Sequence, residues 1–119
     1  MRTIQVIQIP VTDNERAAKF YKQLFGWEFD SVPQLPSILQ THSSNVPVML
    51  SPVHDMHRPG GTFFGISAED IDGDLRKVSE LGGDILLKNT PNPMGTNIAI
   101  IRDPEGAIIV LVEETAKHL

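Results

Sequence analysis

The sequence predicts an α+β domain in which one strand-helix-three-strand module, βαβββ, occurs twice. Extended and helical segments follow one another in the same order in both halves of the 119 residues. A constant shift, which places Ile9 on Ile66, also lays the second half on the first without a gap, and we call this the module alignment. Its identical pairs fall on a strand, a helix start, a helix core and a helix stop: Ile9 with Ile66, Asp13 with Asp70, Leu24 with Leu81, and Gly26 with Gly83. A shared backbone favours shared residues at such places, so we expect one domain over residues 1–119, with modules at approximately 1–57 and 58–119.

The first module begins with a strand and a helix. Residues 3–11 are rich in β-branched side chains that partly alternate, as in a strand. Thr12 and Glu15 have the spacing of a capping box, and apolar residues at helical spacing then continue to Gly26, a residue type suited to a left-handed helix stop. Prolines and a polar run separate three short extended segments, which we place at residues 27–30, 37–41 and 47–52.

The second module repeats this order after a hinge at residues 57–61. Its expected elements are a strand at 62–68, a helix at 70–81 that stops at Gly82-Gly83, and strands at 84–88, 96–102 and 107–113. Residues 92–95 and 103–106 each carry Asn or Asp first, Pro second and Gly fourth, which is the preference of type I turns, so both are expected at hairpin corners. The alternative, a ferredoxin-like sandwich, has fewer strands than this pattern predicts.

Composition excludes several classes of function. The formal net charge is -5, so the clustered cations that bind nucleic acid or an anionic membrane are not expected. The chain contains no Cys, which excludes disulfides, thiolate metal sites and cysteine nucleophiles. No apolar run approaches the length of a membrane span, and the first residues lack the long apolar segment of a signal peptide, so a cytoplasmic location is expected.

Three segments together resemble the vicinal oxygen chelate superfamily of glyoxalase I, bleomycin-resistance proteins and extradiol dioxygenases. They are the run from Asp13 to Trp27, the element from Asp70 to Gly83, and Asp103-Pro104-Glu105-Gly106. The resemblance implies the glyoxalase/bleomycin resistance/dihydroxybiphenyl dioxygenase fold, in which two βαβββ modules form a curved mixed sheet around a cleft. It also implies a homodimer. Metal-using members take His and Glu ligands from the first and last strands of each module.

The positions where this resemblance places metal ligands hold apolar residues. Counting seven residues back from each helix-starting Asp reaches Val6 and Phe63, and counting seven onward from Asp103 reaches Val110. The fourth ligand is expected within residues 46–53, a segment without Asp, Glu or His. A cation without inner-sphere donors incurs a prohibitive desolvation cost. We therefore expect no metal and no other cofactor.

The expected cleft is lined by side chains at these positions and by those that alternate with them: Val6, Gln8, Phe63, Ser67, Ile108, Val110 and Val112. Such a lining suits capture of a hydrophobic or aromatic small organic molecule, and the leading hypothesis is a metal-free domain that sequesters or senses one. Tyr21 and Trp27 belong to the core or stack on a ligand.

Two further hypotheses stay open. The first is a metal-dependent glyoxalase-like lyase or isomerase, or a dioxygenase, with ligands relocated to His42, His54, His57 or Glu113. The competing interpretation of these histidines is a set of solvated side chains on an exposed linker. The second is a protein-interaction module whose cavity has collapsed.

Overall fold

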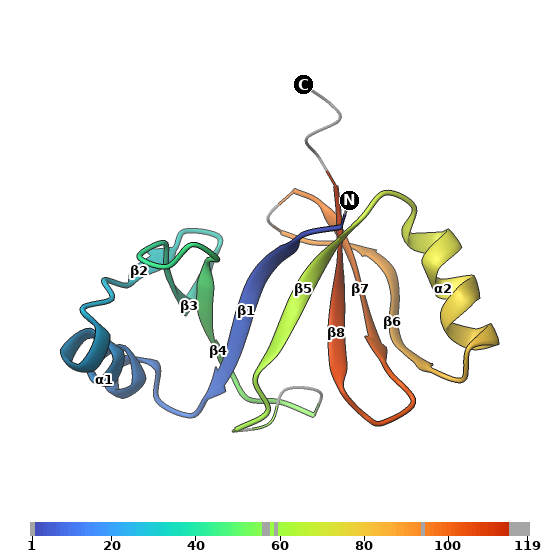
Figure 1. The fold of residues 1–119 in the computed structure, drawn as a ribbon. Helices are drawn as coiled ribbons and strands as arrows, with labels where there is room; N and C mark the ends of the chain where they lie inside the picture. Colours follow the sequence, from blue (N-terminus) through green and yellow to red (C-terminus); the bar gives the residue numbers. More distant parts are fainter. Residues whose placement is uncertain (1, 56–57, 59, 94, 115–119) are drawn as a thin grey trace. The chain divides into compact units, whose positions relative to one another are not determined.

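The computed structural model describes residues 2–55, 58, 60–93 and 95–114. Within them the elements follow one another in the order shown in Figure 1, and the chain divides into two compact units. We call residues 6–62 the N-terminal unit and residues 1–5 with 63–119 the C-terminal unit. None of the helices described is long and apolar enough to span a membrane. The elements are β1 (Ile4–Val11), α1 (Asn14–Phe25), β2 (Asp30–Val32), β3 (Leu35–Thr41), β4 (Val48–Pro52), β5 (Phe63–Ala68), α2 (Ile71–Glu80), β6 (Asp84–Pro91), β7 (Asn97–Arg102) and β8 (Ile108–Glu113).

In the N-terminal unit the strand order is β2-β3-β4-β1. Strand β1 runs parallel to β4, and the other neighbours are antiparallel. Leu50 and Val32 are almost completely buried, and the Thr41 side chain is also buried. This arrangement is one βαβββ module.

In the C-terminal unit the order is β5-β8-β7-β6, and β5 is again parallel to the last strand in sequence, β8. The apolar stripe of α2 packs on one face of this sheet, because a core of buried residues joins the two: Ala68, Ile71, Leu75, Ala99 and Leu111. The two predicted βαβββ modules are therefore confirmed, and the elements other than β2 lie where the sequence predicts them, with β6 extending further, to Pro91. That the whole chain forms a single domain stays a prediction.

Helix α2 starts at Asp70 as the sequence predicts, whereas the cap of α1 is Asp13 and not Thr12, the cap residue of the predicted capping box. The Asp13 carboxylate accepts the Arg16 N–H at 3.0 Å, and the Asp70 carboxylate accepts the Gly73 N–H at 3.0 Å. Gly26 ends α1 in the left-handed conformation, with φ of 76°.

The end of α2 differs from that of α1 by one residue. Its left-handed glycine is Gly82, with φ of 86°, although Gly83 is the residue that aligns with Gly26. Gly83 is needed for another reason, since a Cβ there would lie 2.7 Å from the Arg102 carbonyl oxygen. Gly26 and Gly83 therefore occupy aligned positions after a helix for different reasons. Gly26 is needed for its left-handed backbone conformation, and Gly83 for its lack of a Cβ atom.

The largest departure from the predicted elements lies after α1. The sequence predicts an extended segment at residues 27–30, but the strand here is β2, at residues 30–32. Trp27 and Phe29 instead join an aromatic cluster around Tyr21, whose ring centroid lies 5.7 Å from that of Trp27. Ring packing therefore decides the course of this segment.

Both predicted hairpin corners are present. Gly95 N–H donates to the Asn92 carbonyl at 2.9 Å, and Gly106 N–H donates to the Asp103 carbonyl at 3.0 Å. The Asp103 carboxylate also accepts the Ala107 N–H at 2.9 Å, which fixes the second corner. Met94 in the first corner, and His57 and Pro59 in the predicted hinge, lie outside the described residues.

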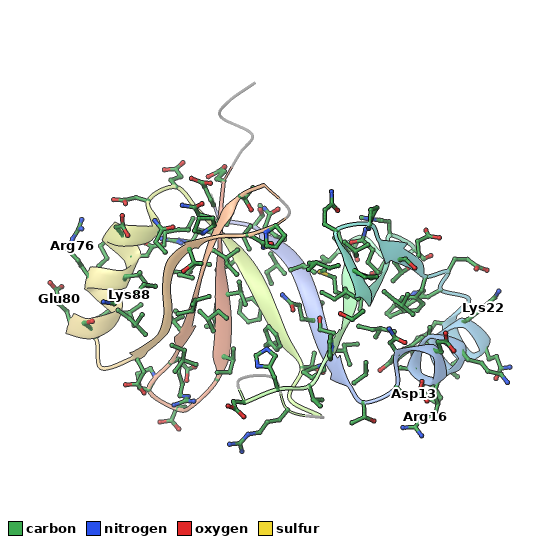
Figure 2. All side chains as sticks on the ribbon, turned by 180° about the vertical axis from the view of Figure 1, so that it is seen from behind. Asp13, Arg16, Lys22, Arg76, Glu80 and Lys88 are labelled. Atoms are coloured by element: carbon green, nitrogen blue, oxygen red, sulfur yellow. The ribbon has the colours of Figure 1, made fainter. Side chains whose placement is uncertain are left out.

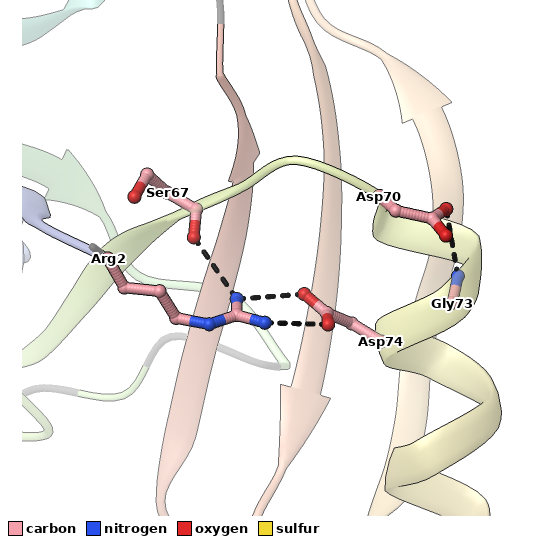
Figure 3. Close-up of polar contacts among 5 residues, drawn as sticks. All are labelled: Arg2, Ser67, Asp70, Gly73 and Asp74. Atoms are coloured by element: carbon pink, nitrogen blue, oxygen red, sulfur yellow. Dashed lines mark hydrogen bonds and ion pairs between the residues drawn. The ribbon is translucent and has the colours of Figure 1, made fainter.

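A polar clasp fastens the first residues of the chain to the rest of the C-terminal unit (Figure 3). The Arg2 guanidinium donates to both carboxylate oxygens of Asp74, at 2.7 and 2.8 Å, and to the Ser67 carbonyl at 3.1 Å. The hydrogen bond to Asp74 raises the pKa of Arg2 above its ordinary value. Thr3 adds two contacts, since its N–H donates to the Ser67 hydroxyl and its carbonyl accepts the Ser67 N–H. We call these contacts the Arg2 clasp.

Candidate small-molecule-binding site

One face of the C-terminal sheet is apolar and lies opposite the face that packs on α2. Residues directly opposite in neighbouring strands share a face, and the pairs here are Gly65 with Val110 and Val110 with Ile100. Ile66, Ala68 and Leu111 belong to the other face, which packs on α2. We call the face opposite α2 the open face of this unit, which means only that α2 does not pack on it.

Five of the residues expected in the cleft lie on this open face: Phe63, Ser67, Ile108, Val110 and Val112. Phe63 and Val110 are 4% exposed, whereas Ile108 and Val112 are half-buried. The hydroxyl oxygen of Ser67 is already engaged, because it accepts the Thr3 N–H at 2.9 Å. Phe63 and Val110 are therefore already covered, and the accessible hydrocarbon of this face belongs to Ile108 and Val112.

The N-terminal unit carries the other two expected residues, Val6 and Gln8, on the corresponding face of β1. Gln8 pairs with Met49 of β4, and Met49 pairs with Gln40 of β3. The Ser51 hydroxyl donates to the Gln8 side-chain oxygen at 3.4 Å. This face is more polar than that of the C-terminal unit, and its hydrogen-bonding groups are neutral.

Strand pairing identifies the fourth position at which the sequence resemblance expects a metal ligand. Gly65 is the counterpart of Gln8 in the module alignment, and it pairs with Val110. Gln8 pairs with Met49 in the same way, so Met49 is the counterpart of Val110. The four positions are thus Val6, Met49, Phe63 and Val110.

These four side chains do not fit a divalent metal ion. Three are hydrocarbons, and the Met49 thioether is a soft donor suited to Cu(I) rather than to the cations that imidazole and carboxylate bind. Among residues 2–55, 58, 60–93 and 95–114, no group of three or more His, Asp or Glu side chains is arranged to hold a metal. The donor chemistry that the sequence resemblance leads one to expect is missing from these positions.

The residues considered for a relocated metal site are spread over the chain. His42 is exposed just after β3, His54 is an exposed residue after β4, and both belong to the N-terminal unit. Glu113 belongs to the C-terminal unit, where its carboxylate accepts the Asn97 N–H at 3.0 Å. His57 lies outside the described residues.

Sequence reasoning missed Met49, Gln40 and the β7 residues Ile98 and Ile100, which share these faces. In β7 the run Ile98-Ala99-Ile100-Ile101 is apolar throughout, so alternation could not tell which residues face α2. The constant shift of the module alignment places Val53, not Met49, on Val110, so only the strand pairing identifies Met49.

Comparisons with known proteins agree with this architecture. The model of a family described as the Glyoxalase/Bleomycin resistance protein/Dioxygenase superfamily matches residues 3–111. A glyoxylase-like domain-containing protein of Didymella fabae is 34% identical over 88 residues, which cover 67% of this chain and 68% of that protein.

Solved structures show the same fold. A hypothetical protein from Bacillus halodurans C-125 superposes with a TM-score of 0.73 at 18% identity, covering 96% of this chain and 95% of that one. A glyoxalase/bleomycin resistance protein/dioxygenase superfamily member from Vibrio splendidus 12B01 gives 0.69 at 17% identity, covering 94% and 100%. With the family model matching nearly the whole length, this chain belongs to the glyoxalase/bleomycin resistance protein/dioxygenase superfamily.

Proposed function

We propose that this chain binds a small hydrophobic or aromatic compound without a metal ion, and that it sequesters or senses that compound. The observation that carries the proposal is the set of side chains at the four ligand positions, Val6, Met49, Phe63 and Val110, none of which suits a divalent cation. An apolar lining with few polar groups is the usual character of a small-molecule site.

The open face of the C-terminal unit supports binding rather than acid-base chemistry. Its residues Phe63, Val110 and Ile100 are hydrocarbons, and the Ser67 hydroxyl already accepts a backbone N–H. Strand pairing also places Arg102 and Asp84 on this face, opposite Ile108 at its end, where the two charges pair with each other at 3.8 Å. A general acid or base needs a titratable group within hydrogen-bonding reach of the substrate. The proposal therefore assigns no catalytic residue.

The test combines metal analysis with ligand-induced stabilisation. Protein equilibrated with Ni, Zn, Mn and Fe and then desalted is expected to retain far less than one metal per chain. Indole, 1-naphthol and octanoate serve as hydrophobic probes, and at least one is expected to raise the melting temperature by several degrees at saturating concentration, with or without EDTA. One tight metal equivalent that is lost in a His54/His57 double Ala variant would establish the relocated site and refute the proposal.

Two variants on the same strand locate the probe. Val110→Ala enlarges the open face, so it is expected to change the ranking of the three probes. Leu111→Ala, on the neighbouring residue that packs toward α2, lowers the melting temperature but leaves the ranking unchanged. If no probe stabilises the protein, the protein-interaction hypothesis replaces this one.

The proposal includes a homodimer, a single domain and a cytoplasmic location, as the sequence resemblance and composition imply. Light scattering coupled to size-exclusion chromatography measures the mass of the particle in solution and so tests the homodimer. A monomer at 100 μM would remove the dimer from the proposal without affecting ligand binding.

A further inference from the structure

We infer that a groove beside helix α1 in the N-terminal unit binds a small aromatic carboxylate. The groove has a volume of about 410 Å³ and lies between the end of β1 and one flank of α1. Pro10, Val11 and Ala17 supply its aliphatic surface, Phe20 and Tyr21 supply aromatic rings, and Arg16 supplies a cation. A drug-sized or smaller ligand fits such a volume.

Phe20 is exposed to an extent that packing within its unit does not explain. It is 58% exposed, and its ring meets Tyr21 edge to face at a centroid distance of 5.3 Å. Its counterpart in α2 under the module alignment is Lys77, a residue that suits solvent. The module therefore does not require an apolar side chain here, and an exposed ring is left available for stacking.

Arg16 is a second feature that the repeated module does not require. Its counterpart is Gly73, and within the described residues its guanidinium makes no ion pair. The guanidinium donates to the Thr12 hydroxyl at 3.4 Å, a long contact that leaves most of its donors for another acceptor. Figure 2 shows Arg16 beside Asp13 on one side of α1, and Lys22 on another.

Asp13 also lines the groove, and it keeps its negative charge because its hydrogen-bond donor is a neutral backbone N–H. Its carboxylate accepts the Arg16 backbone N–H at 3.0 Å as the helix cap, where it faces the positive end of the helix dipole. The Arg16 guanidinium is the cation of this lining, so a ligand carboxylate is expected to bind it on the side away from Asp13. A planar guanidinium binds a carboxylate through two parallel hydrogen bonds, so a carboxylate is the group it recognises best.

The spacing of Arg16 and Phe20 matches the ligand. Residues four apart on a helix lie one above the other, with Cβ atoms about 5–6 Å apart. A benzoate or phenylacetate ion places its ring and its carboxylate at comparable separation, so one molecule can contact both side chains.

This groove is separate from the site of the proposed function. Side chains alternate along β1, so Val11 lies on the face opposite that of Val6 and Gln8, whereas Pro10 lies on their face. Apart from Pro10 and Val11 at the end of the strand, the groove is lined by residues 12–21, which follow β1 and form α1. The inference therefore stands or falls without reference to the residues of the proposed function.

Trp27 offers an optical readout, because it is the single Trp of the chain and its ring stacks on Tyr21 with centroids 5.7 Å apart. The experiment titrates sodium benzoate and phenylacetate into the full chain at constant ionic strength. It follows Trp27 emission and the backbone amide shifts of residues 12–21 by NMR. Benzamide, which has the ring without the charge, is the matched control ligand.

The expected result is saturable binding of benzoate, with shifts centred on residues 12–21 and affinity for benzamide at least about tenfold weaker. Arg16→Gln and Phe20→Ala each weaken benzoate binding by about tenfold or more, and Arg16→Lys by less. Lys19→Gln, which removes a cation that does not line the groove, leaves the affinity within twofold. Arg16 and Phe20 are both exposed, so the variants are expected to keep the fold.

Four outcomes would overturn the inference. In the first, benzoate up to 20 mM does not shift the amides of residues 12–21. In the second, the shifts in Arg16→Gln and in Phe20→Ala are as large as those in the parent chain. Shifts could instead fall on β7 and β8, in which case binding belongs to the open face of the C-terminal unit. Finally, shifts of residues 12–21 that follow protein concentration and ignore benzoate would assign the groove to a second copy of the chain.

Discussion

Replacing Val110 by glutamate restores the residue type that metal-using relatives are expected to carry there, and its effect tests the loss of the metal site directly. Val110 is 4% exposed, and its neighbours across the sheet are Gly65 and the equally buried Ile100. Neither has a side chain that can donate a hydrogen bond to a carboxylate. The introduced carboxyl group is therefore expected to stay protonated in the folded state, because burial raises the pKa of a carboxyl group.

The pH dependence of the free energy of unfolding gives the size of the effect of Val110→Glu. The ordinary pKa of glutamate is about 4.3, and a buried carboxyl without partners can titrate above about 7. Between these values the folded state binds more protons than the unfolded state, so the free energy of unfolding falls as pH rises, by about 1.4 kcal/mol per pH unit. From about pH 4.3 to about pH 7 the Val110→Glu variant loses roughly 3.7 kcal/mol relative to the parent chain.

Urea unfolding between pH 4.5 and pH 8 measures this slope. Val110→Gln is the matched control, because it has the same shape and no titratable proton, and it is expected to cost stability equally at every pH. A flat profile for Val110→Glu would show that the carboxylate finds donors or water. Recovery of its stability with 1 mM Zn²⁺ or Mn²⁺ would show that metal donors surround position 110, and either result would refute the reasoning.

Further consequences for stability concern the clasp, two glycines and the core. Arg2→Ala is expected to cost about 1 kcal/mol by urea unfolding, and Arg2→Lys to recover part of it, because the pair is half-exposed and bidentate. Because the pKa of Arg2 is raised, the stability that Arg2 contributes is complete below the ordinary arginine pKa and is lost only at higher pH. The stability cost of Arg2→Ala is therefore expected to be constant from pH 5 to 9, and a cost that changes over that range would contradict this assignment. Gly83→Ala is expected to cost about 1–3 kcal/mol through backbone overlap, more than Gly26→Ala, where only the left-handed conformation is strained; the reverse order would refute the close contact. Leu50→Ala removes a completely buried side chain and should cost about 2–5 kcal/mol, whereas Leu24→Ala, 60% exposed, should stay within about 0.5 kcal/mol by the same assay.

The repeated module was predictable because its signals are local. Asp13 and Asp70 cap helices through their own neighbouring amides, and Asp103 shapes its own turn, so short sequence patterns are enough to place these elements. The module alignment holds for the first strand and the helix of each module, but it does not match β4 to β8 in register, because the connections before these strands differ in length. Structural comparison confirmed the fold.

What the sequence could not predict depends on partners outside the local pattern. Trp27 and Phe29 leave the expected strand because Tyr21 offers a ring to pack against. Arg2 has no local pattern that points to Asp74, which lies in the other half of the sequence. The faces of β7 were undetermined for a related reason, since a fully apolar strand gives no alternation and only its pairing with β8 assigns each side chain to a face.

The Arg2 clasp has a consequence for the duplicated architecture. The two halves look like interchangeable copies when aligned, yet the first residues of the chain supply hydrogen bonds to Ser67 and Asp74. The division of the chain in space is therefore offset from the division of its sequence, because residues 1–5 belong with 63–119. If the chain were cut at its midpoint, the first piece would carry residues 1–5, which pack with the second piece. The second piece would then hold Ser67 and Asp74 without Arg2 and Thr3, so neither piece would be a complete structural unit.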